Sequence, residues 1–215
     1  MRVSQRADGT PDVEPAVLVL GIGNLLWADE GFGVRAAEAL HARWRLPSRV
    51  SVVDGGTQGL ALLDLVCAAD QLLVFDCVDF GLPPGTLQIL RDRAVPAWSD
   101  RAFSLHQASF QELLWLARWR ERFPRRLTLI GVQPAVIDDL GGSLSPLVRA
   151  RVDEAVDLAV RELAAWGVVA FPRATPPTQA LAADALALAR YEAGRPSSDA
   201  ACRIGDVRFL ARRNG

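Results

Sequence analysis

Acidic side chains and one histidine stand where ligand sites form in α/β proteins. Asp29 and Glu30 follow a short apolar run, Asp54 ends a second and Asp76 ends a third, while His106 precedes a helical segment. The carboxyl ends of parallel strands meet at one edge of a sheet, and ligands bind beyond that edge. Carboxylate and imidazole together suit divalent transition metals, so the pattern favours nickel, zinc or iron there.

Most of these residues also have a structural explanation. Asp29 and Glu30 can be first-turn acids that stabilise a helix N-terminus. His106 can be an ordinary loop histidine, as His41 is expected to be on its arginine-bearing helix. Asp76 differs because it follows four apolar residues, and a carboxylate next to a buried strand needs a partner.

Two glycine-rich loops accompany the acids. Residues 21–26 (GIGNLL) resemble a dinucleotide fingerprint, but Leu26 occupies the third glycine position. Two carboxylates then stand where a phosphate would need bare backbone N–H groups, so the loop suits a cation. Residues 54–59 (DGGTQG) can form a tight turn in which Thr57 caps the next helix. They contain more glycine than such a turn requires.

The elements alternate along the chain. Strands are expected at 16–22, 50–53, 72–75, 86–90 and 127–132, and helices at 33–44, 57–69, 107–119 and 145–166. Alternating elements with apolar strands indicate an α/β fold with a mostly parallel five-stranded sheet. The fourth strand is expected to be an antiparallel edge, because only a short loop separates it from the third.

Three regions are expected. Residues 1–15 form a polar N-terminal extension, 16–172 an α/β domain, and 173–215 a C-terminal appendage. Within the appendage, 180–191 is predicted to be helical after a linker at 173–178. Whether this segment is ordered or partly disordered stays open at this level.

Composition excludes several classes of function. The net charge is −1 without a basic block, so no nucleic-acid partner is expected. All 24 basic residues are Arg, which rules out a lysine Schiff base. Cys67, Cys77 and Cys202 show no CxxC spacing and fit a reducing compartment. With no signal peptide and no apolar run long enough for a bilayer, we expect a cytoplasmic protein without a membrane partner.

No nucleophile stands out among the serines and cysteines. Cys77 follows Asp76 directly, but a small buried hydrophobe is its default role. The sequence contains no Gly-x-Ser-x-Gly elbow, and neither Ser104 nor Cys77 has a recognisable base and orienting partner.

Together these motifs resemble the hydrogenase maturation endopeptidases. The resemblance rests on residues 21–26, 29–34, 54–59, Asp76 and 104–107 (SLHQ). In addition, 127–134 (LTLIGVQP) is similar to the family's fifth-strand segment. The matches follow the family's order and cover about residues 16–172.

The resemblance implies a fold, a substrate and a site. The fold is a three-layer α/β sandwich whose twisted sheet is flanked by helices. The substrate is a nickel-loaded [NiFe]-hydrogenase large-subunit precursor, from which a C-terminal peptide is removed. Glu30, Asp76 and His106 carry the motif's metal-binding and catalytic positions. The longer tail resembles members that serve membrane-bound uptake hydrogenases. Substrate recognition is implied for the second loop, at Asp54, Gly55, Gly56, Thr57 and Gly59.

Two carboxylates and one imidazole cannot complete a metal's coordination shell. Nickel, or another divalent transition metal in its place, would therefore be supplied by the precursor. The metal can polarise the scissile carbonyl or activate water, or a carboxylate can act as general base; the sequence leaves these open. A non-catalytic nickel-dependent checkpoint protein that binds the same precursor is the competing hypothesis, and a small-molecule metal hydrolase is a weaker one.

Overall fold

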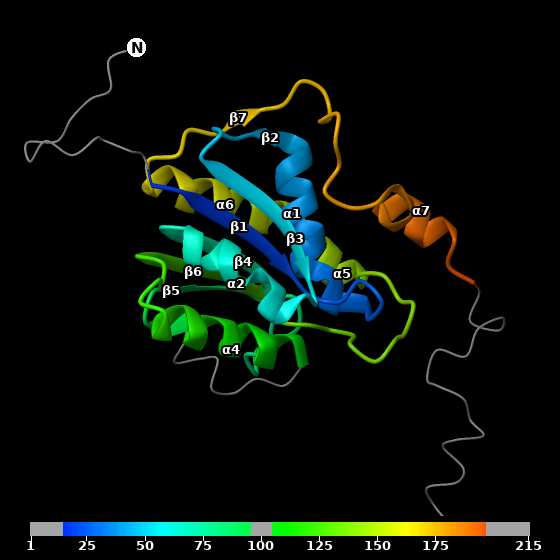
Figure 1. Cartoon of the computed structure of the whole chain (residues 1–215). Coiled ribbons are helices and arrows are strands. Elements are labelled where there is room, and N and C mark those ends of the chain that lie inside the picture. Colours follow the sequence, from blue (N-terminus) through cyan, green and yellow to red (C-terminus); the bar gives the residue numbers. More distant parts are fainter. Residues whose placement is uncertain (1–14, 96–104, 197–215) are drawn as a thin grey trace, which may run out of the picture.

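A five-stranded sheet forms the centre of the molecule (Figure 1). The computed structural model describes residues 15–95 and 105–196, with the backbone alone for 105–108. The strand order is β3–β1–β4–β6–β5, where β1 is Val17–Ile22, β3 Val50–Gly56, β4 Gln71–Cys77, β5 Leu87–Arg91 and β6 Arg126–Val132. All neighbouring strands are parallel except β5, which pairs antiparallel with β6 at one edge. The mostly parallel sheet is confirmed.

Helices cover both faces of this sheet, which makes three layers (Figure 1). On one face, α1 (Phe32–Arg43), α5 (Pro146–Arg149) and α6 (Val152–Ala165) share a core with Val19 and Phe75. On the other, η2 (Gly59–Leu62), α2 (Leu63–Ala68) and α4 (Leu105–Trp119) share a second core with Leu20 and Val74. Because successive strand residues point to opposite faces, β1 and β4 are buried along their whole length.

Several boundaries differ from the sequence-based expectations. The second expected strand continues to Gly56 and therefore contains Asp54. Gln58, not Thr57, occupies the N-cap of η2, so the expected Thr57 cap is wrong. The helix expected at 145–166 is divided into α5 and α6, because Arg151 N–H bonds the Val148 carbonyl at 3.0 Å, an i−3 bond that tightens the turn. The Ser145 hydroxyl does cap α5, accepting from Val148 N–H.

The region after the sheet returns along α1. Strand β7 (Phe171–Pro172) pairs antiparallel with β2 (Trp44–Arg45), at the end of α1. In place of the helix expected at 180–191, the chain forms η3 (Asp184–Leu186) and α7 (Leu188–Ala193). Residues 1–14 of the expected extension, Ser104 and Cys202 lie outside the described residues. Within the described part of the chain, no helix has both the length and the apolar character to cross a bilayer.

Candidate active site

Three acid-bearing segments meet at the carboxyl edge of the sheet. Strand β1 lies between β3 and β4, and its Gly21 pairs with Asp54 on one side and Phe75 on the other. Asp76 is therefore one residue beyond that register, while the chain leaving β1 carries Glu30 in the short η1 helix, Ala28–Gly31. The expected convergence of Glu30, Asp54 and Asp76 on one edge is confirmed.

Close packing of the first glycine loop places Glu30 over the end of β1. Gly23 has φ +140°, and a Cβ there would lie 1.9 Å from the Glu30 carbonyl oxygen. The neighbouring Asn24 N–H donates to that carbonyl at 3.1 Å. At Gly33 a Cβ would lie 2.3 Å from the Phe75 carbonyl oxygen, so α1 begins against β4, directly beside Asp76. These glycines thus allow close approach of backbone to backbone.

Several carboxylates at this edge of the sheet affect the pKa of the Cys77 thiol. Burial raises the pKa of this thiol well above its ordinary value, and the charges of Asp76, Asp29, Glu30 and Asp79 raise the pKa further, in that order. Asp76 itself is 3% exposed and accepts the Cys77 backbone N–H at 2.8 Å. Such a negative region disfavours a thiolate and favours a cation.

Asp29 does not have the role expected of a first-turn acid. It is fully buried, and its carboxylate accepts backbone N–H groups of Ala135, Val136 and Ser145 at 2.9, 2.8 and 2.6 Å. The Ser145 hydroxyl also donates to it, at 3.0 Å. Asp29 therefore anchors the loop of residues 133–145 beside Glu30.

The second glycine loop lies against the first. Gly23 N–H donates to the Gly56 carbonyl at 3.0 Å, and the Gln58 side chain donates to the Asp54 carbonyl at 3.1 Å. Burial raises the pKa of Asp54, an effect that the Gly56 N–H and then Arg35 oppose. Thr57 is exposed.

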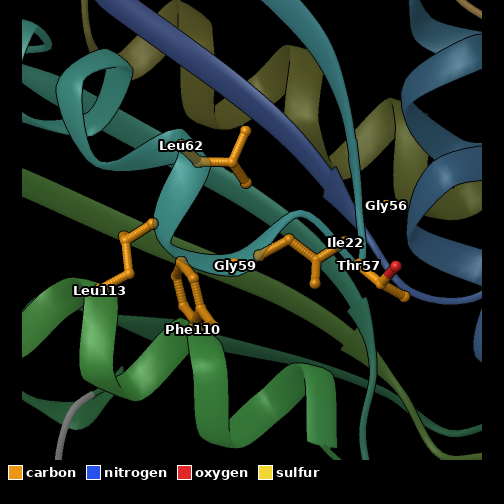
Figure 2. Close-up of a pocket in the computed structure, with 7 residues that line it drawn as sticks. All are labelled: Ile22, Gly56, Thr57, Gly59, Leu62, Phe110 and Leu113. Carbon is orange, nitrogen blue, oxygen red and sulfur yellow. The ribbon is translucent and has the colours of Figure 1, made fainter.

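A small apolar hollow separates the second glycine loop from α4 (Figure 2). It has room for one water molecule at most. The lining residues, labelled in Figure 2, are Ile22, Gly56, Thr57, Gly59, Leu62, Phe110 and Leu113. The loop thus borders the carboxylate edge, and its role in substrate recognition stays a prediction.

His106 lies in the first turn of α4 rather than in the preceding loop. Its side chain is outside the described atoms. Among the side chains that are described, no three His, Cys, Asp or Glu residues form a group able to hold a metal. The trio of Glu30, Asp76 and His106 therefore stays a prediction.

The sequence matches the hydrogenase maturation protease family over residues 34–162. The chain belongs to this family. It is 52% identical over 200 residues to the hydrogenase expression/formation protein HupD of Thiocapsa roseopersicina, covering 92% of this chain and 90% of that protein. The hydrogenase 2 maturation protease of Escherichia coli K12 is 41% identical over 158 residues, or 73% of this chain and 96% of its own.

Solved structures agree with this assignment. The hydrogenase maturating endopeptidase HybD from E. coli superposes with a TM-score of 0.71 at 40% identity, over 73% of this chain and 97% of HybD. The predicted family, fold and peptidase activity are confirmed. This chain is a hydrogenase maturation endopeptidase that acts at the C-terminus of a large-subunit precursor. Peptidase membership stands against the hypothesis of a non-catalytic checkpoint protein.

Gln133 has a structural role in the protease that the sequence motifs did not predict. It is 7% exposed, and its side-chain oxygen accepts Phe80 N–H at 2.7 Å and Leu82 N–H at 3.2 Å. Its amide nitrogen donates to Asp79 at 2.9 Å, and this bond is the main cause that lowers the Asp79 pKa. Gln133 thereby fixes the chain that leaves β4 after Asp76. In the sequence, its importance is indicated only by its place in residues 127–134, the segment that is similar to the family's fifth strand.

Proposed function

We propose that the protease cuts its precursor only after nickel insertion, and that the precursor's nickel is what it recognises. The observation that carries this proposal is the convergence of Glu30, Asp54 and Asp76 on one edge of the sheet. Asp76 is buried and Glu30 is half-buried at this edge, so the edge carries negative charge, which a cation brought by the substrate would neutralise.

Nickel is part of the substrate in this proposal. Glu30 and Asp76 supply oxygen ligands and His106 supplies an imidazole, a donor set that suits nickel and leaves positions for ligands from the precursor. Another divalent transition metal could take the same donors. The metal then aligns the scissile peptide bond with the carboxylates.

Hydrolysis uses water, with two routes open to this donor set. The nickel can polarise the carbonyl or activate water. Alternatively, Glu30 or Asp76 can take a proton from water as general base. Cys77 has no part in either route, because its raised pKa keeps the thiol protonated.

The proposed substrate is the large subunit of a membrane-bound uptake hydrogenase. Support comes from the chain beyond residue 172, which resembles the longer tails of members that serve such enzymes. The aligned HupD spans 92% of this chain, so its alignment includes most of that tail. The loop of Asp54, Gly55, Gly56, Thr57 and Gly59 is proposed to recognise which subunit is presented. We place the reaction in the cytoplasm, where thiols such as Cys67 stay reduced.

Matched nickel-free and nickel-loaded precursors test the proposal. Both are incubated with the protease, and the products are weighed by mass spectrometry. We expect shortening of the loaded form alone. Equal cutting of both forms would refute nickel recognition while leaving the peptidase assignment intact. An Asp54→Asn variant, assayed with cognate and non-cognate precursors, tests the recognition loop in the same experiment.

A further inference from the structure

The segment of residues 173–195, here called the strap, follows α1 along its length (Figure 1). At its start, Arg173 N–H donates to the Arg43 carbonyl at 2.7 Å, and its guanidinium donates to the carbonyls of His41 and Trp44. Farther along, the His41 ring lies 2.9 Å from the Gln179 carbonyl oxygen. The strap is thus fixed to the end of α1 that is distant from Glu30.

A buried arginine holds the middle of the strap. The Arg35 side chain is only 4% exposed, pairs with Glu38 at 2.9 Å and donates to the Leu186 carbonyl at 2.7 Å. Its guanidinium also lies 5.7 Å from the centre of the Tyr191 ring. Because a buried guanidinium needs its partners, these contacts bind the strap to α1.

The end of the strap contacts the loop of residues 133–145, here called the docking loop. The contacting pairs are Tyr191 with Gly142, Glu192 with Ser143, and Arg195 with Asp139. The Arg195–Asp139 ion pair is largely covered, with side chains 25% and 28% exposed. Strap and docking loop therefore form one connected unit.

The other side of the docking loop is bonded to the segment that carries Glu30. Besides the Asp29 anchor, Gly141 N–H donates to the Leu26 carbonyl at 2.7 Å, and Trp27 forms a bridge with Leu140. The docking loop thus lies between the strap and the carboxylate edge, and its position depends on both.

The docking loop and Leu26, which is bonded to it, expose apolar side chains. Ile137 is 52% exposed and Leu26 50%, and Val136 and Leu140 are also exposed. Grouped apolar residues on a surface mark an interaction site. A metal ion or a short polar peptide would not bury them, whereas a folded protein bound at the adjacent carboxylates would.

We propose that the docking loop is the surface on which the folded large-subunit precursor rests, and that the strap holds this surface in place. The inference rests on the proposed function, since it takes the substrate from it. The HupD relative aligns over 92% of this chain and so includes the strap. The E. coli hydrogenase 2 maturation protease is a shorter protein, because an alignment with 73% of this chain covers 96% of it.

Exchanging the charges of Arg195 and Asp139 tests whether the strap holds the docking loop in place. Arg195→Asp or Asp139→Arg alone should raise KM for the nickel-loaded precursor about three- to tenfold, with kcat nearly unchanged. The double variant should recover most of the lost affinity, which general structural damage would not allow. The matched control is the exposed Arg190–Asp184 pair, which lies in the strap outside these loop contacts. Its reversal should leave KM unchanged.

Polar substitution tests the surface itself. Ile137→Ser should raise KM about tenfold without loss of stability, because its side chain is exposed. Val169→Ser, at an exposed position beyond α6, is the control. Unchanged KM in both Ile137→Ser and Arg195→Asp would overturn the inference, provided that the wild type cuts the precursor. A wild type that cuts neither precursor form would instead contradict the proposed function.

Discussion

The carboxylate of Asp29 lies 2.8 Å from the backbone nitrogen of Val136 and accepts its N–H. The same buried carboxylate accepts the N–H groups of Ala135 and Ser145. One side chain thus joins the segment that carries Glu30 to the loop across from it. Each partner would lose a charged acceptor if the carboxylate were removed.

Asp29→Asn should lower the free energy of unfolding by about 1–3 kcal/mol, because an amide cannot accept from all of these donors and leaves a buried N–H unsatisfied. Urea unfolding measures the change. Asp64→Asn is the control, since Asp64 is exposed and pairs with Arg120 at the surface. Equal stability of the Asp29 variant and the wild type would show that the anchor is dispensable.

Gly23→Ala should reduce precursor processing about a hundredfold. The added Cβ would collide with the carbonyl oxygen of Glu30 and push this residue away, and the rate of cleavage falls steeply when a catalytic group is misplaced. Gly81→Ala is the matched control. Gly81 also has a positive φ, +69°, but within the described structure its Cβ would meet no atom within 4 Å. It should therefore show backbone strain of about 1 kcal/mol and normal cleavage. Normal cleavage by Gly23→Ala would mean that the loop tolerates rearrangement.

The metal trio can be tested residue by residue. Glu30→Gln, Asp76→Asn and His106→Ala should each reduce cleavage about a hundredfold or more while circular dichroism stays unchanged. His41→Ala should leave kcat unchanged, because His41 contacts the strap rather than the carboxylate edge. Full processing by Asp76→Asn would remove Asp76 from the ligand set.

Replacing Cys67, Cys77 and Cys202 by Ala or Ser should leave measurable cleavage. Burial and the neighbouring Asp76 raise the Cys77 pKa, so its thiol is a poor nucleophile. A loss of about 1–3 kcal/mol in stability is expected from the buried Cys77. Complete inactivity of a folded Cys77→Ser protein, judged by circular dichroism beside the cleavage assay, would argue for thiol catalysis.

Glu162 provides a pH-dependent contribution to stability. Its hydrogen bonds with Arg91 are the main cause that lowers the Glu162 pKa below the ordinary 4.5. The folded state therefore prefers the carboxylate, and the stabilisation is complete above pH 4.5 and is lost as pH falls through the lowered pKa. Glu162→Gln should cost about 1 kcal/mol at neutral pH. Urea unfolding across pH should show the difference from wild type shrinking in acid; a constant difference would contradict the linkage.

The sequence alone determined the alternation of elements and the edge at which acids gather. Runs such as 16–22 and 72–75 are apolar on both faces, which only a covered strand of a parallel sheet accommodates. Once the strands are parallel, residues at or just past their carboxyl ends share one edge, so the placement of Glu30, Asp54 and Asp76 at that edge follows from local pattern. That the first glycine loop is unsuited to phosphate stays a prediction, which rests on the two acids that follow the loop.

The tertiary structure decided which distant groups these residues contact. Asp29 was expected to stabilise its own helix, but its donors come from residues 135–145, and no local spacing encodes that pairing. The short loop before residues 86–90 predicts an edge strand, and β5 is one. Its partner is β6 and not β4, the strand that precedes it in the chain, because β6 lies between β4 and β5 in the sheet. The strap was undecided for the same reason. The alanine-rich residues 180–191 have a strong local preference for helix, yet they form the short η3 and α7, and their position depends on tertiary contacts such as Arg35 with Leu186.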